Sequence, residues 1–119
     1  MKIAITSQGE NLESEIDARF GRAKGFIIYD DLTAEFSFQD NNQNLTSAQG
    51  AGIQSAKTII DAGAEVLITG NVGPKAFTAL EKSGVKIFIG AKGNVQDGIT
   101  DFLKDKLQQA QGANVDGHW

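Results

Sequence analysis

Apolar positions along the first forty residues follow the short periods of β-strands. Residues 2–6 and 25–30 are brief apolar runs rich in β-branched side chains, and residues 34–39 alternate between apolar and polar side chains. These patterns are typical of buried and half-buried strands. The tight turn at 31–33 predicts that the second and third strands form a hairpin, whereas residues 7–24 follow neither period and predict a long loop.

The rest of the chain alternates between helical and strand periods. Pro74 suits the first turn of a helix and Asn94 can cap another. The expected order β-β-β-α-β-α-β-α indicates an α/β fold, with a mixed five-stranded sheet flanked by helices and its second strand antiparallel to the others. The elements expected after the hairpin are a helix over 48–62, a strand over 65–70, a helix over 74–83, a strand over 85–90 and a helix over 95–107.

This topology predicts where a ligand would bind. Four of the five strands run the same way, so the loops that leave their carboxyl ends open at one edge of the sheet. Ligands of open α/β sheets favour that edge. The loops concerned are 7–24, 40–47, 70–74 and 90–94.

Composition restricts the chemistry that could occur there. The 119 residues include no cysteine and one histidine, His118, which excludes a disulfide framework, thiolate metal sites and a multi-histidine site. The net charge of −4 argues against nucleic-acid binding, because phosphates require a surplus of lysine and arginine. No run approaches the ~20 apolar residues of a membrane span. We therefore expect a soluble, cytoplasmic protein with one domain over 1–107 and a flexible C-terminal tail over 108–119.

The most informative segment is the end of the first long loop. Arg19 and Arg22 are the only arginines of the chain, and Lys24 follows them. The planar guanidinium presents a fork of donors that suits anionic oxygens and that lysine does not reproduce. Two interpretations remain open: the arginines face an anionic ligand, or Arg22 pairs with Asp17 or a nearby glutamate and so holds the loop in place.

Glycines at two predicted helix starts add weaker signals. Gly50 and Gly52 begin one helix, and Asn71 and Gly73 precede another. Backbone N–H groups at a helix N-terminus favour anions. Close packing of helix on sheet, or an ordinary strand-to-helix loop, would explain the same glycines equally well. Phe20 is either a core anchor for its loop or an apolar wall of the pocket.

Catalytic groups are sparse in the sequence. The serines have no histidine base except His118, and no pair of carboxylates follows adjacent strands as two-metal hydrolysis requires. Glu10, Glu13, Glu15 and Asp17 are typical of a solvated surface. We therefore expect a binding protein rather than an enzyme.

Three motifs together resemble a known family. Phe20-Gly21-Arg22-Ala23, Gly50-x-Gly52 and Gly70-Asn71-x-Gly73 are similar to motifs of the dinitrogenase iron–molybdenum cofactor biosynthesis family, and the resemblance extends to about residue 107. It implies a ribonuclease-H-like fold and the binding or carriage of metal–sulfur clusters. Members include nitrogenase cofactor carriers and orange-protein-type binders of a molybdenum–copper sulfide cluster. Cluster-delivery or acceptor proteins would be the partners, with no nucleic acid or membrane.

One departure from the family pattern affects the expected mode of binding. Many relatives have a histidine where this chain has Arg19. The resemblance therefore implies that a preassembled anionic cluster, of molybdenum–copper sulfide or iron–molybdenum type, is held by cationic side chains and backbone N–H groups. Direct metal ligands are left open, with His118 a remaining candidate. The expected cofactor-binding residues are Arg19, Phe20, Gly21, Arg22, Lys24, Gly50, Gly52, Asn71 and Gly73.

Two other functions remain alternatives. A small module that binds a nucleotide or another phosphorylated metabolite would use the same cationic loop, and a pure protein-interaction domain would leave it empty. Nuclease activity, which the ribonuclease-H-like fold also supports, is disfavoured. The first strand, Lys2-Ile3-Ala4-Ile5-Thr6-Ser7, contains no acidic residue to hold a divalent cation.

Overall fold

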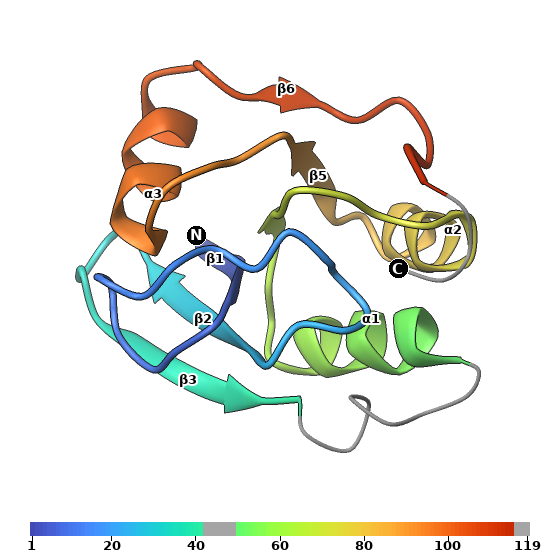
Figure 1. The fold of residues 1–119 in the computed structure, drawn as a ribbon, viewed down its shortest axis with the longest axis horizontal. Helices are drawn as coiled ribbons and strands as arrows, with labels where there is room; N and C mark the ends of the chain where they lie inside the picture. Colours follow the sequence, from blue (N-terminus) through green and yellow to red (C-terminus); the bar gives the residue numbers. More distant parts are fainter. Residues whose placement is uncertain (42–49, 116–119) are drawn as a thin grey trace.

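The fold has three layers, with a central sheet between helices (Figure 1). A computed structural model of the chain describes residues 1–41 and 50–115. α1 and α2 pack side by side on one face of the sheet, and α3 covers the other. The elements are β1 (Lys2–Ser7), β2 (Gly25–Asp30), β3 (Phe36–Asp40), α1 (Ala51–Asp61), β4 (Val66–Ile68), α2 (Pro74–Lys82), β5 (Lys86–Ile89), α3 (Val95–Leu103) and β6 (Gln108–Gln109).

The sheet order is β3-β2-β1-β4-β5-β6. β1 pairs parallel with β4, which pairs parallel with β5, whereas β2 is antiparallel to both β1 and β3. The predicted hairpin, mixed α/β sheet and reversed second strand are thus confirmed. The carboxyl ends of β1, β3, β4 and β5 lie along one edge of the sheet, and the long β1–β2 loop starts there. Residues 42–47 of the expected 40–47 loop lie outside the described residues.

A sixth strand corrects the predicted number of five. α3 ends at Leu103 instead of continuing to Leu107, and Asp105, with a φ of 57°, turns the chain back. β6 then pairs antiparallel with β5. Both residues of β6 are exposed glutamines, so the sequence has no alternation of apolar and polar residues that would predict this strand. Residues 108–115 were expected to belong to a flexible tail, and instead they continue the fold.

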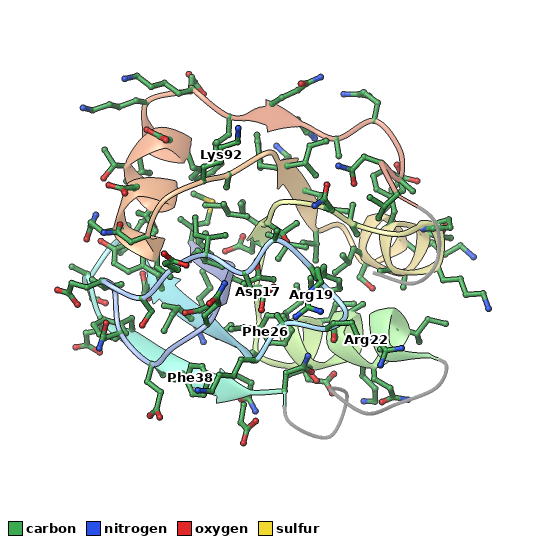
Figure 2. The ribbon with its side chains drawn as sticks, in the orientation of Figure 1. Asp17, Arg19, Arg22, Phe26, Phe38 and Lys92 are labelled. Carbon is green, nitrogen blue, oxygen red and sulfur yellow. The ribbon has the colours of Figure 1, made fainter. Side chains whose placement is uncertain are left out.

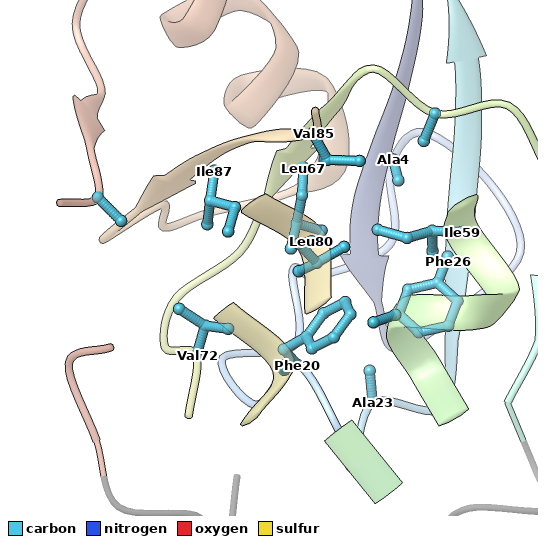
Figure 3. Packing of buried hydrophobic residues seen from close by; sticks show 14 of the residues in the cluster. Ala4, Phe20, Ala23, Phe26, Ile59, Leu67, Val72, Leu80, Val85 and Ile87 are labelled. Atoms are coloured by element: carbon cyan, nitrogen blue, oxygen red, sulfur yellow. The ribbon is translucent and has the colours of Figure 1, made fainter. Parts of the chain in front are cut away.

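Two apolar clusters fill the space on either side of the sheet. Side chains alternate across a strand, so Ala4 faces α1 and α2, while Ile3 and Ile5 face α3. Phe20 is fully buried on the α1 and α2 side, and its ring centroid lies 5.7 Å from that of Phe26 (Figure 3). The β1–β2 loop therefore contributes a core side chain as well as its charged residues.

Local signals at the helix ends agree with the sequence. Gly63, after α1, has a φ of 86°, the left-handed conformation that glycine adopts readily. Asn94 caps α3: its side chain accepts a hydrogen bond from the backbone N–H of Asp97, whose carboxylate accepts one from the N–H of Asn94. None of the helices in residues 1–41 and 50–115 is long and apolar enough to cross a bilayer.

Candidate functional site

The end of the β1–β2 loop is fastened to two parallel strands of the sheet. The hydroxyl of Thr6 in β1 donates a 2.6 Å hydrogen bond to the carbonyl of Asp17, and the N–H of Asp17 donates to the carbonyl of Thr6 at 3.0 Å. Beyond β4, the N–H of Asn71 donates to the carbonyl of Ala18 at 2.8 Å, and the N–H of Phe20 donates to the carbonyl of Asn71 at 3.3 Å. These bonds hold the arginine-bearing segment at the carboxyl edge.

A pocket of about 460 Å³ lies at this segment. Figure 2 shows Asp17, Arg19 and Arg22 together on the β1–β2 loop. The pocket therefore brings together the three cationic side chains that the sequence singled out. Its lining residues are Gln8, Asp17, Arg19, Arg22 and Lys24.

Asp17 is the buried carboxylate among the residues that line the pocket. It is only 6% exposed, and its Oδ1 accepts a 3.0 Å hydrogen bond from the N–H of Arg19. The same oxygen lies 3.7 Å from Nε of Arg19, whose side chain is 52% exposed. A short side chain that binds the backbone two residues later is a common feature of turns, so Asp17 stabilises the turn that carries Arg19. The expectation that Asp17 belongs to the solvated surface is wrong.

Phe20 and Gly21, which lie between Arg19 and Arg22 in the chain, hold this loop to the core and to α1. The Phe20 side chain is 0% exposed, which corrects the expectation that it lines the binding site and favours its interpretation as a core anchor. The carbonyl of Gly21 accepts hydrogen bonds from Asn41 at 3.4 Å and from Ser55 at 3.3 Å. Because Ser55 lies in α1, the second of these bonds links the arginine loop to that helix.

Gly50, Gly52 and Gly73, the other glycines of the predicted site, serve helix packing and helix ends. A Cβ at Gly52 would lie 3.2 Å from the Cβ of Ala76, so this glycine permits the close approach of α1 to α2. Gly50, with a φ of 76°, and Gly73 are the N-cap residues of α1 and α2. Neither these three glycines nor Asn71 line the 460 Å³ pocket among the described residues. The expected convergence of two helix starts on the arginines is therefore not what forms this pocket.

Sequence reasoning missed two contributors to this edge. Gln8 lines the pocket directly after β1, and its position at a strand's carboxyl end was the available signal. Asn114 donates to Oδ1 of Asn71 at 3.1 Å, and no pattern in its polar, glycine-containing segment indicated a contact with the sheet.

The donor set decides which kinds of metal species could bind. Within residues 1–41 and 50–115, no group of three or more histidine, cysteine, aspartate or glutamate side chains could hold a metal ion. His118 lies outside the described residues. The pocket lining combines Arg19, Arg22 and Lys24 with Asp17 and Gln8, so it presents more positive than negative side chains.

Comparisons with known proteins agree with the motifs. The family model described as dinitrogenase iron–molybdenum cofactor matches residues 1–105. The apo form of the orange protein from Desulfovibrio gigas is 39% identical, with a TM-score of 0.93 over 96% of each chain. A putative NifB protein from Thermotoga is 34% identical, with a TM-score of 0.84 over 98% of each chain.

A curated relative covers nearly the same length. An uncharacterized protein of Methanocaldococcus jannaschii is 27% identical over 111 residues, which make up 92% of this chain and 91% of that protein. The matches therefore run through the sheet, the arginine loop and the helices. The chain belongs to the dinitrogenase iron–molybdenum cofactor family, the one its motifs resemble, and its role is related to a metal cluster.

Proposed function

We propose that the protein binds and carries a preassembled anionic metal–sulfur cluster at the pocket beside Asp17, without catalysing a reaction. The observation that supports this most directly is the lining of the pocket. Arg19, Arg22 and Lys24 all contribute to it, against a single carboxylate, in a chain whose net charge is −4. Cationic side chains outnumber carboxylates in the pocket lining, whereas carboxylates outnumber cationic side chains over the whole chain.

The donor chemistry fits a cluster with its own sulfide shell. Guanidinium and ammonium groups offer N–H donors and no electron pairs for a metal. Sulfide ligands on the outside of an anionic cluster are acceptors that such donors can bind. Because the chain has no cysteine, the sulfur must arrive with the cluster. The protein would supply charge and orientation.

The proposed composition of the cluster rests only on the similarity of this chain to its relatives. The similarity to the orange protein supports a molybdenum–copper sulfide cluster as the cargo, and the family description supports an iron–molybdenum type as the alternative. Delivery or acceptor proteins in the cytoplasm would be the partners. In the described part of the chain, the lining of the pocket includes no histidine, serine, threonine or tyrosine side chain, which favours carriage over catalysis.

The test uses purified protein and a tetrathiomolybdate–copper cluster. We expect a coloured 1:1 complex that survives gel filtration and weakens as salt is raised, since exposed charges are screened. Arg19→Gln, Arg22→Gln and Lys24→Gln should each weaken binding roughly three- to tenfold, as expected for charge-assisted hydrogen bonds of about 1 kcal/mol at an open site.

Lys104→Gln is the matched control. It makes the same charge change on an exposed lysine outside the pocket, so its affinity should equal that of the unaltered protein. If the cluster elutes apart from the protein, or if all four variants bind equally, the pocket does not hold it.

A phosphorylated metabolite would use the same cationic side chains, and a thermal-shift panel separates the two ligands. A ligand that binds only the folded state raises the melting temperature by mass action. We expect a shift with the cluster and none with nucleotides or inorganic phosphate at equal concentration. A shift with nucleotides alone would replace the cluster by a nucleotide as the ligand.

A further inference from the structure

The segment after β6 is hydrogen-bonded to the loop between β4 and α2 through Asn114. Oδ1 of Asn114 accepts a 2.8 Å hydrogen bond from the N–H of Val72, and its Nδ2 donates to Oδ1 of Asn71 at 3.1 Å and to the carbonyl of Gly70 at 3.5 Å. The backbone N–H of Asn114 also donates to the carbonyl of Val72 at 3.1 Å. Asn114 therefore binds three successive residues of that loop.

Asn71 is in turn bound to the arginine-bearing loop. Its N–H and its side-chain Nδ2 both donate to the carbonyl of Ala18, at 2.8 and 3.3 Å, and its own carbonyl accepts from the N–H of Phe20 at 3.3 Å. Ala18 and Phe20 flank Arg19. A continuous set of hydrogen bonds thus runs from Asn114 through Asn71 to the backbone on both sides of Arg19.

The two loops are close enough that movement of one must displace the other. A Cβ placed on Gly70 would come within 2.8 Å of the Cα of Ala18, so the backbones touch without a side chain between them. The side chain of Asn71 has two bonding ends, with Oδ1 toward Asn114 and Nδ2 toward Ala18. Loss of the first contact leaves this amide free to rotate away from the second.

We propose that Asn114 is a positioning residue for the arginine pocket, acting through Asn71 to fix the backbone that carries Arg19. It lies beyond residues 1–105, which the family model matches, and it does not line the pocket. Its effect on ligand affinity rests on the proposed function. Its effect on the loop does not.

Amide hydrogen exchange tests the effect on the loop without any ligand. Asn114→Ala should speed exchange at the N–H groups of Asn71 and Phe20 about fivefold or more, the change expected when one hydrogen bond of ordinary strength is lost. Gln111→Ala, at an exposed position of the same segment, should leave both unchanged. Unaltered exchange at Asn71 and Phe20 would overturn the proposal. An equal increase throughout β1 and β2 would overturn it too, because Asn114 would then stabilise the whole fold rather than this loop.

Binding of the tetrathiomolybdate–copper cluster tests the consequence for the pocket. Asn114→Ala should lower affinity about three- to tenfold and flatten its salt dependence, because a displaced Arg19 makes a weaker ionic contact. The same substitution in an Asn71→Ala background should have little further effect, since groups that act through one another are not additive.

Full additivity of the two substitutions would refute the route through Asn71. If the unaltered protein retains no cluster while the exchange result holds, the proposed cargo fails and the positioning role stands. If the cluster binds and exchange at Asn71 and Phe20 is unchanged, the cargo stands and the positioning role fails.

Discussion

Replacing Gly70 by alanine measures how tightly the arginine loop lies against the end of β4. The added Cβ would lie 2.8 Å from the Cα of Ala18 and 2.9 Å from its carbonyl oxygen. Both are backbone atoms, so no side-chain rotation relieves the contact, and one of the two segments must shift. Overpacking of this kind costs about 1–3 kcal/mol. In a domain of this size the melting temperature changes by roughly 4 °C per kcal/mol, so we expect a fall of about 4–12 °C.

Gly112→Ala supplies the control, because it adds the same methyl group where no atom lies within 4 Å of the new Cβ. Its unfolding free energy should stay within about 0.5 kcal/mol of that of the unaltered protein. Scanning calorimetry and urea unfolding give the two values independently. Equal melting temperatures for Gly70→Ala and Gly112→Ala would show that the loop does not press on β4, and the geometry described for the site would be wrong.

Two further substitutions test the packing and the helix cap. Phe20→Ala removes a fully buried ring and should cost about 3–5 kcal/mol in urea unfolding; a loss below about 1 kcal/mol would contradict its place in the core. Asn94→Ala removes the cap of α3 and should cost about 1 kcal/mol, with faster amide exchange at Asp97; an unchanged unfolding midpoint would contradict the cap.

Most of the fold could be predicted from the local spacing of apolar residues along the sequence. The β-branched runs at 2–6 and 25–30 became β1 and β2, and the alternation at 34–39 placed β3 beside β2. Asn94 caps its helix as expected. These features depend on neighbours a few residues apart, so a single sequence contains what is needed to predict them. The arginines stood out by their residue type, and their loop begins at the carboxyl end of β1 as expected, but the described residues that line the pocket all come from that one loop.

Features set by distant contacts were not predictable in this way. β6 consists of two exposed glutamines, and what makes them a strand is the open edge of β5. Asp17 resembles a surface carboxylate in the sequence. It is buried where its backbone bonds to the hydroxyl and the carbonyl of Thr6 and its carboxylate accepts from the N–H of Arg19. Phe20 belongs to the same apolar cluster as Phe26 only because the loop folds back over the sheet. Each of these depends on pairings between segments that local patterning does not encode.

The negative net charge of the chain and the cationic lining of its pocket would act on an approaching anion over different distances. At physiological ionic strength, charges separated by more than about 8 Å are largely screened, so a net charge of −4 spread over the surface opposes an arriving anion only weakly. At contact the local cations dominate. Nε of Arg19 lies 3.7 Å from Oδ1 of Asp17, and because the arginine side chain is 52% exposed, this ion pair contributes little to stability. Arg19 therefore stands beside a buried carboxylate with about half of its side chain open to solvent, where an anionic ligand of the kind proposed would reach it.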